Sequence, residues 1–408
     1  MDSKSLNQLY IISFLDSFCT GLTLPVLNNY IVVGLKGSHF LLGLLSMVQV
    51  LSQIIISPLL SPVTMFVGAR NLLLFSHVMT FFNYLIVIIA NDYRLFLLFR
   101  MPFFFFNQTQ YSTDVLIAKT QQTTGDHYVR QLKNVAFILG PFCGGLLYHD
   151  TSILCVASMI NILTTLSLVL AYKLPQDNIT TNIQLPSPPM SKLWQSSWRE
   201  CWKSKSLLSM VKILTTIGLS CFFIKFTLVM TANLNASASL IGFTIAMHNL
   251  IFHSAKFACQ LLNNSVLSIQ KHIRQLLLTC LLVMTIAMYI LCRSHDYGEY
   301  LLAFVGLAMS REMFERLWGI EADSMTKNSM ECLQKLITCV LPVVLGAYCD
   351  LYSHRAVQTL AVVPLIFATL LGFKQLAWQP ENSKMKVVEQ QIMKSFNLAI
   401  SANNKKHN

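Results

Sequence analysis

Apolar residues recur along the chain in runs of about 20, the length of helix that crosses roughly 30 Å of bilayer hydrocarbon. Short polar breaks separate these runs. They predict an all-α membrane protein with twelve transmembrane helices, near residues 8–31, 38–61, 70–91, 95–117, 132–149, 152–174, 210–231, 239–262, 275–293, 297–319, 333–350 and 355–378. The first run is too long for the core of a signal peptide and no small-residue cleavage site follows it, so we interpret it as a helix of the protein.

One long polar break divides the predicted spans into two sets of six. The resulting organisation is an N-terminal bundle over 1–174, a cytoplasmic linker over 175–206, a C-terminal bundle over 207–378 and a cytoplasmic tail over 379–408. Within the linker, Trp194, Trp198 and Trp202 recur every four residues and so share one helical face. This spacing predicts an amphipathic helix that lies on the membrane surface or against the cytoplasmic ends of the bundle.

Basic residues are unevenly distributed between alternate loops. With the N-terminus inside, the outer loops hold only four of them: Lys36, Arg94, Arg293 and Arg355. Lysine and arginine favour the cytoplasmic side, so we expect both termini to be cytoplasmic, in either the plasma membrane or an organelle membrane. The same asymmetry accounts for most of the net charge of +12, and it gives no reason to expect a nucleic-acid partner.

The composition offers little for enzymatic chemistry. Charged residues make up 12% of the chain and hydrophobic residues 54%, and the eleven cysteines are scattered without a CxxC pair. They resemble small buried hydrophobic residues rather than metal ligands or a disulfide framework. Because nucleophile and phosphate-loop motifs are also missing from the sequence, we expect neither an enzyme nor a metal or cofactor.

A weak internal repeat relates the two halves. "ILGPFCGGLLYHD" (138–150) and "CVLPVVLGAYCD" (339–350) close the fifth and eleventh spans, and Pro141 and Gly145 match Pro342 and Gly346 at a constant offset. Parallel repeats of this kind predict two pseudo-symmetric six-helix bundles. Small residues allow helices to approach closely, so we expect this region to pack against the other half and seal one side of the protein. A simple packing kink is the alternative interpretation. The predicted gating and packing residues in these spans are Gly140, Pro141, Gly144, Gly145, Pro342 and Gly346.

These features resemble the major facilitator superfamily. Its fifth-helix motif ends in Gly-Pro-x-x-Gly-Gly, which "GPFCGG" matches, although Ala136 replaces an earlier glycine of that motif. "FLDSFCTGLTLPVL" (14–27) and the arginine of "FRMP" (99–102) resemble the drug:proton antiporter-like branch. The likeness is nearest to the group of major facilitator superfamily domain-containing protein 9 and solute carrier family 22 member 18. It implies the major facilitator fold and secondary transport by alternating access.

The loop between the second and third spans departs from the family pattern. It reads "SPVTMFVGARNLLL" (61–74), which keeps Gly68 and the gating candidate Arg70, but Met65 stands where the family carries an aspartate. In the family, that aspartate belongs to a charge network that locks the cytoplasmic gate. Its loss predicts either a weaker inner gate or a protein that has drifted from transport toward a scaffolding or sensing role.

Ionisable and polar residues inside the spans point to a substrate cavity, because they are costly to bury in a membrane. The candidates lie in the first, fourth, seventh and tenth spans, which surround the central cavity in the resembled family: Asp16, Thr20, Thr23, Arg100, Asn107, Tyr111, Lys225, Arg311, Glu312 and Glu315. Two alternatives stay open. Arg311 with Glu315, and Glu312 with Arg316, have the i,i+4 spacing of a structural clasp, and Asp16 could make a structural hydrogen bond.

The sequence therefore predicts a secondary active transporter of a small organic solute, with an anionic or zwitterionic solute favoured by the basic cavity residues. Coupling to protons, through Asp16 or a glutamate of the tenth span, is a further hypothesis. The expected partners are the lipid bilayer, the solute and protons, and the expected state is a monomer. The alternative is a membrane scaffold or sensor that has lost transport.

Overall fold

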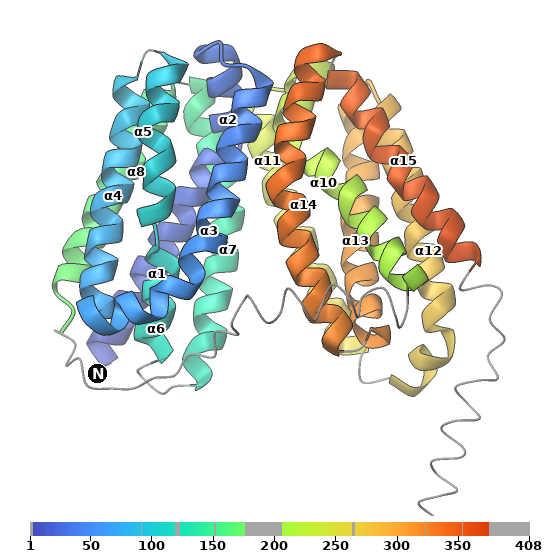
Figure 1. The fold of residues 1–408 in the computed structure, drawn as a ribbon, viewed down its shortest axis with the longest axis horizontal. Coiled ribbons are helices and arrows are strands. Elements are labelled where there is room, and N and C mark those ends of the chain that lie inside the picture. The colour runs from blue at the N-terminus through green and yellow to red at the C-terminus, as the bar shows by residue number, and fades with distance from the viewer. Residues whose placement is uncertain are drawn as a thin grey trace, which may run out of the picture.

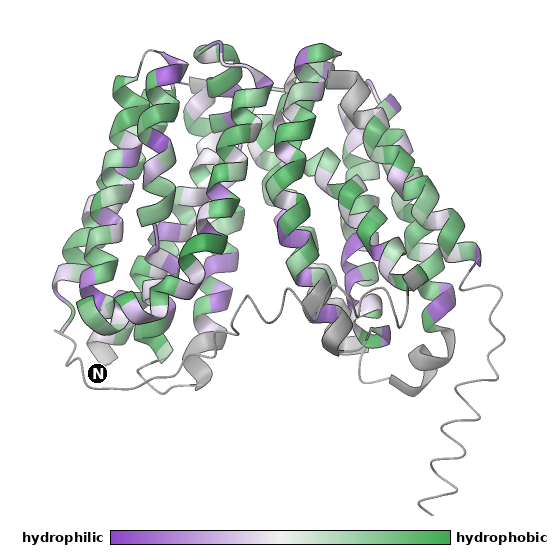
Figure 2. Cartoon of the chain, viewed as in Figure 1, coloured by the Kyte–Doolittle hydropathy of each residue, from purple (hydrophilic) through white to green (hydrophobic). Residues whose placement is uncertain are grey.

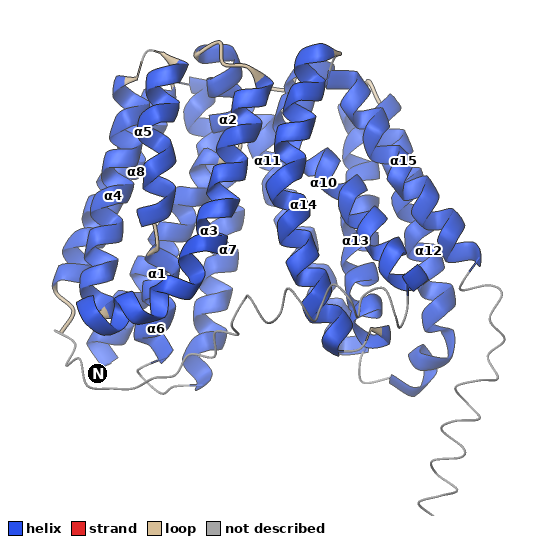
Figure 3. Ribbon diagram, in the orientation of Figure 1, coloured by secondary structure: helices blue, strands red, loops and turns tan. Residues whose placement is uncertain are grey.

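The computed structural model describes residues 3–90, 92–118, 123–150, 152–175, 206–262, 266–322, 324–352 and 354–374. All secondary structure in these ranges is helical, without a strand (Figure 3). The predicted linker helix with Trp194, Trp198 and Trp202, and the predicted tail, lie outside the described residues.

The N-terminal half forms one bundle of helices. The first path across it is bent by 43° and consists of α1 (Ser3–Thr23), α2 (Leu27–Asn29) and the π-helical η1 (Tyr30–Gly34). The others are α3 (His39–Val67), α4 (Ala69–Ile89), α5 (Tyr93–Phe106), α6 (Thr109–Ala118), α7 (Thr123–Asp150) and α8 (Ile153–Tyr172). Helices α5 and α6 together form the fourth span, which is interrupted at residues 107 and 108.

The C-terminal half forms a second bundle. It consists of α10 (Ser206–Leu234), α11 (Ala238–Leu262), α12 (Val266–Arg293), α13 (Tyr297–Glu321), α14 (Ser324–Leu351) and α15 (His354–Gly372). Its core is continuous from α10 through α12 and α13 to α15, with Leu277, Phe304 and Leu365 among the fully buried residues. Each predicted span overlaps one helix, except the first and the fourth, which overlap interrupted helices, and the end of the last span, at 375–378, lies outside the described residues.

Three helices begin well before the apolar runs that predicted them. Helix α7 begins at Thr123, α12 at Val266 and α14 at Ser324, ahead of the predicted starts at 132, 275 and 333. Hydropathy locates only the part of a helix that suits hydrocarbon, whereas backbone hydrogen bonds continue through polar turns such as "TTGDHYVRQ" at the start of α7. Six described helices are long and apolar enough to cross a membrane, and the bent first path makes a seventh.

The two bundles stand side by side and approach each other most closely at the end opposite the N-terminus (Figure 1). Apolar residues cover most of the length of the helices (Figure 2). Many large apolar side chains face outward, including Phe66, Ile162 and Leu302, which are 84%, 69% and 76% exposed. This surface suits lipid, which solvates apolar side chains as well as a protein core does.

Candidate functional site

Close backbone contacts join the two bundles between α7 and α11. A Cβ added to Gly145 would overlap the backbone of Ala238 and Ser239, at the start of α11. One added to Gly242 would overlap the carbonyl of Pro141 and lie 3.1 Å from the Cα of Gly145. Only glycine allows these two helices to approach so closely, so both glycines define this interface.

The same arrangement recurs between α3 and α14. A Cβ on Gly43 would overlap the Pro342 carbonyl, and one on Gly346 would overlap the carbonyl of His39 and lie 2.8 Å from the Cα of Phe40. Gly43 and Gly242 are each the fifth residue of their helix, α3 and α11. The two interfaces are therefore equivalent under the internal repeat. The sequence indicated Pro141, Gly145, Pro342 and Gly346 but not the facing glycines.

Gly140 and Gly144 have a different place from the one predicted. A Cβ on Gly140 would lie 2.8 Å from the Cα of Gly21, and one on Gly144 would overlap the backbone of Leu22. Both therefore pack α7 against α1 inside the N-terminal bundle. The Gly-Pro-x-x-Gly-Gly motif thus uses one helix face for its own bundle and another for the opposite bundle.

Polar contacts reinforce the α3–α14 interface. The Asp350 carboxylate accepts hydrogen bonds from the backbone N–H groups of His39 and Phe40, both at 2.9 Å, and so caps the start of α3 from the other half of the protein. Between α11 and α7, the side-chain amide of Asn249 donates to the Phe137 carbonyl at 2.7 Å. A carboxylate at a helix N-terminus is favoured by the free N–H groups and the helix dipole.

Arg70, at the turn between α3 and α4, meets no carboxylate among the residues that the structure describes. Its Nη2 donates to the backbone carbonyl of Tyr172 at 2.6 Å, and its guanidinium lies 5.6 Å from the centre of the Tyr172 ring. Arg70 therefore binds the C-terminal end of α8. Met65 is 49% exposed, and Gly68 makes the turn with a φ of 84°, a conformation that favours glycine.

The interruption of the fourth span places Thr109 against Asp16. The Thr109 hydroxyl donates to the Asp16 carboxylate at 2.8 Å, and the Asn107 amide oxygen lies 3.4 Å from the same hydroxyl. The first turn of α6 begins at Thr109, so the carboxylate lies near a helix N-terminus, where negative charge is stabilised. The structure thus shows the hydrogen bond that was one interpretation of Asp16, while its only partial burial leaves the cavity interpretation open.

Serine side chains from two other helices satisfy the interrupted backbone. The Ser76 hydroxyl donates to the Phe106 carbonyl and accepts from the Gln108 N–H, both at 3.2 Å. The Ser52 hydroxyl lies 3.2 Å from the Phe104 carbonyl. Irregular backbone at membrane depth is tolerated where other protein groups replace its hydrogen bonds, so the break is a stable feature of the fold.

The other polar candidates of the first and fourth spans have separate places. The Thr20 and Thr23 hydroxyls donate to carbonyls of their own helix, at 3.0 and 2.8 Å. Thr20 and Asn107 are exposed and Tyr111 is half-buried. These side chains remain candidates for a surface between the bundles.

Arg100 and Lys225 are enclosed, although the sequence placed them in the cavity. Arg100 is 4% exposed and lies over the rings of Phe96, Phe104 and Tyr84 at 5.3 to 5.7 Å, an arrangement that stabilises a cation without an anion. Lys225 is 1% exposed, and its ammonium lacks a hydrogen-bond partner among the described residues. In this conformation neither side chain is open to a solute.

Helices α10 and α13 bring together a charged cluster, which we define as Lys212, Arg311, Glu312, Glu315 and Arg316. The predicted Glu312–Arg316 pair is confirmed, with 2.8 Å between Oε1 and Nε. Arg311 and Glu315, the other pair with i,i+4 spacing, form no ion pair in the structure, and Glu315 forms one with Lys212 of α10. Arg311 instead stacks on Phe223, 4.9 Å from the ring centre.

Sequence reasoning missed Lys212 and Thr109. Lys212 comes at the start of its predicted span, where a lysine ordinarily reaches the lipid headgroups, and its partner is about a hundred residues away in the sequence. Asp16 with Thr109 lies in one bundle and the charged cluster lies in the other, and no hydrogen bond or ion pair among the described residues joins them.

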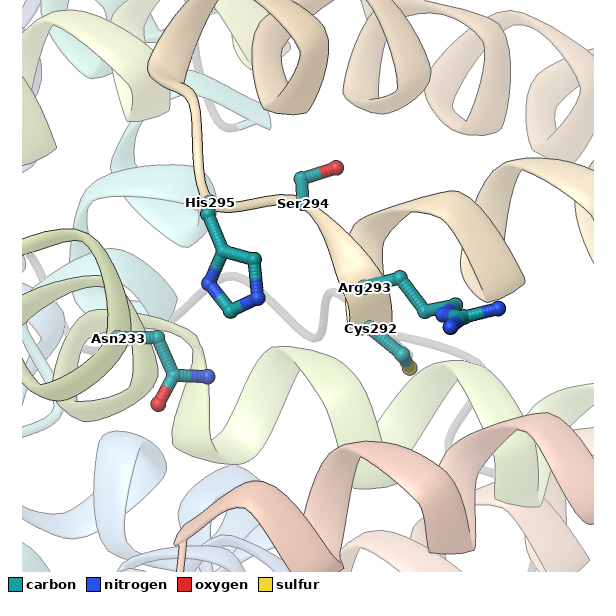
Figure 4. Close-up of a pocket in the computed structure, with 5 residues that line it drawn as sticks. All are labelled: Asn233, Cys292, Arg293, Ser294 and His295. Carbon is teal, nitrogen blue, oxygen red and sulfur yellow. The ribbon is translucent and has the colours of Figure 1, made fainter.

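A separate pocket of about 220 Å³ lies in the C-terminal bundle, where α10 and α12 end, and is lined by Asn233, Cys292, Arg293, Ser294 and His295. Figure 4 shows the Asn233 and His295 side chains turned toward one another, with Arg293 directed away from them. Arg293 donates to the Tyr289 hydroxyl at 2.9 Å. The pocket contains none of the predicted site residues.

Comparison with solved structures establishes the fold. No family model and no curated protein matches the sequence. Two crystal structures of the nucleoside transporter NupG are similar at 13% identity. The TM-score is 0.72 for the structure of a NupG mutant and 0.66 for the other NupG structure. They cover 91% and 93% of this chain, and 99% and 100% of the NupG chains. The human organic anion transporter MFSD10 is similar at 12% identity and a TM-score of 0.57, over 91% of this chain and 100% of its own. The chain therefore has the major facilitator fold of these membrane transporters.

Proposed function

We propose that this protein is a secondary active transporter that moves a small organic solute across a membrane by alternating access. The observation that carries the proposal is the matched pair of glycine interfaces, Gly43 against Pro342 and Gly242 against Pro141. Two equivalent contacts at one end of the molecule allow that end to close and open symmetrically as the bundles rock. The fold that it shares with transporters of nucleosides and organic anions supports the same reading.

The polar groups supply the solute path in this proposal. Asp16, Asn107 and Thr109 in one bundle and the charged cluster in the other lie on helices of the first, fourth, seventh and tenth spans. Such groups are costly in hydrocarbon and are retained where they meet a solute, an ion or one another. Proton coupling through Asp16, or through Glu312 and Glu315, is part of the proposal.

The topology belongs to the proposal as well. Both termini are cytoplasmic, residues 175–206 link the two bundles on that side, and the protein acts as a monomer in a plasma or organelle membrane. With this orientation the glycine interfaces close the outer end, so the described conformation faces the cytoplasm. The loop distribution of lysine and arginine supports this assignment.

A ligand screen followed by a transport assay tests the function. A solute at about 100 times its Kd should add about 2.7 kcal/mol to the free energy of unfolding of the purified protein, which raises its unfolding temperature. Solutes that pass this screen should then exchange across the membrane of proteoliposomes that contain the protein. Binding without exchange for every such solute would contradict transport.

A membrane scaffold or sensor is the second candidate, and the turn between α3 and α4 favours it. Met65 supplies no charge there, and Arg70 is engaged by the end of α8 rather than by a gating carboxylate. A scaffold needs no solute-dependent motion. It therefore predicts no shift in unfolding temperature across a broad panel of solutes, with the protein still folded in the membrane.

A further inference from the structure

Arg311 is the cation of the charged cluster that has no ionic partner. Lys212 pairs with Glu315, and Arg316 pairs with Glu312, whereas no described residue forms an ion pair or hydrogen bond with Arg311. Three cations and two carboxylates leave the cluster with one positive charge in excess. An excess charge within a membrane span is expensive, so a neutralising anion would be favoured beside the cluster.

The guanidinium of Arg311 is presented in a way that leaves its donors available. The Cζ atom of Arg311 lies over the Phe223 ring, 4.9 Å from its centre, and an aromatic ring in this position accepts no conventional hydrogen bond from the guanidinium. Arg311 is partly exposed, whereas Arg100 is 4% exposed and its Nε and Nη1 are buried without a hydrogen-bond partner. A partly exposed guanidinium without a hydrogen-bond partner among the described residues suits bidentate binding of a carboxylate.

An apolar surface adjoins this donor group. The ring centre of Phe223 lies 5.1 Å from that of His248, and both residues are partly exposed, so rings from α10 and α11 form this surface. Phe304 of α13 is buried in the core, with its ring centre 5.4 Å from that of His248. A ligand whose acid group reaches Arg311 would lay its body along the rings of Phe223 and His248. Burial of such a body adds apolar contact to the charge interaction.

We infer that Arg311, backed by Phe223, binds the acid group of an amphiphilic organic monoanion, with the ring of His248 as part of the surface for its apolar body. This rests on the proposed function and names the class of solute. One negative charge matches the single excess positive charge of the cluster. A neutral solute of the same shape would leave that charge uncompensated.

Binding of benzoate and of benzamide to the purified full-length protein tests the inference, because the two have nearly the same shape and differ in charge. Benzoate should raise the unfolding temperature and benzamide should not. Arg311→Gln should weaken benzoate binding at least tenfold. Arg311→Lys, which keeps the charge without the planar fork, should weaken it less. Arg293→Gln is the matched control at the distant pocket and should bind like the unchanged protein.

Several results would overturn the inference: equal binding of benzoate and benzamide, an unchanged benzoate affinity in Arg311→Gln, or no binding of either benzoate or hexanoate. If Arg311→Gln does not fold, the comparison of Arg311→Lys with Phe223→Leu decides, because both should weaken benzoate binding while benzamide stays inert. Failure of the proposed transport function can be told apart from failure of the anion site. Anion binding without exchange of any solute would contradict transport alone, and exchange that benzoate does not inhibit would contradict the anion site alone.

Discussion

Gly43 and Pro342 meet so closely that the backbone of one helix lies directly on that of the other, and Gly242 and Pro141 repeat the contact on the opposite side. Pseudo-symmetry therefore extends from the sequence repeat to the interface between the bundles. Each contact leaves no room for a side-chain carbon. Substitution of either glycine by alanine, which adds a single side-chain carbon, therefore tests the interface directly.

Gly43→Ala and Gly242→Ala should each loosen the closed end of the protein. The added methyl group cannot fit without separating the helices, and overpacking typically costs about 1–3 kcal/mol. The amides of His39 and Phe40, which donate to Asp350, should exchange faster with deuterated water. Gly306→Ala is the matched control, because an added Cβ there meets nothing within 4 Å. An unchanged exchange rate of these two amides in Gly43→Ala would show that the interface accommodates the methyl group without separation of the bundles.

Gly144→Ala should act differently, because Gly144 packs α7 against Leu22 of the same bundle. The methyl group would separate two helices of one core, so the free energy of unfolding should fall by about 1–3 kcal/mol. Exchange at His39 and Phe40 should change little. Thermal unfolding compared with Gly319→Ala, where an added Cβ also meets nothing within 4 Å, checks this. An unchanged free energy of unfolding in Gly144→Ala, together with faster exchange at His39 and Phe40, would show that Gly144 serves the interface between the bundles instead.

The sequence predicted the helices well because membrane spans are specified locally, by runs of apolar residues. It also indicated Pro141 and Gly145, because their repeat partners could be compared directly. Gly43 and Gly242 were not predicted, since which glycine faces another helix depends on packing between distant segments. The break after Phe106 was missed for the same reason: Ser52 and Ser76, from other helices, supply the hydrogen bonds that stabilise it.

The Lys212–Glu315 pair should show an asymmetric response to removal of either partner. The Lys212 side chain is 2% exposed and that of Glu315 is 37% exposed. Glu315→Gln leaves a buried ammonium with only the rings of Phe314 and Trp318, whose centres are 5.6 and 5.1 Å away, and should cost about 3 kcal/mol. Lys212→Met leaves a carboxylate that water can reach and should cost about 1 kcal/mol.

The double variant Lys212→Met with Glu315→Gln should be more stable than Glu315→Gln alone, because it removes the unpaired charge. Unfolding in detergent, measured for both single variants and the double variant, gives the coupling free energy. Glu299→Gln, at the start of α13, serves as a control carboxylate outside the cluster. Additive effects of the two single changes would show that the ion pair contributes nothing to stability.

Asp16 should respond differently to changes in its charge and in its hydrogen bond. Asp16→Asn keeps the shape of the side chain and removes the titrating group, so the protein should fold, because a neutral amide costs less to bury than a carboxylate. Thr109→Val removes the hydroxyl that donates to Asp16 at 2.8 Å and keeps the charge. If Asp16 carries the coupled proton, Asp16→Asn should lose solute accumulation driven by a pH gradient in proteoliposomes but retain solute exchange. Thr109→Val should retain both, with a shifted pH dependence. Gradient-driven accumulation at the unchanged level in Asp16→Asn would show that the carboxylate serves the structure of the α5–α6 break, and Glu312 and Glu315 would then be the groups to test for coupling.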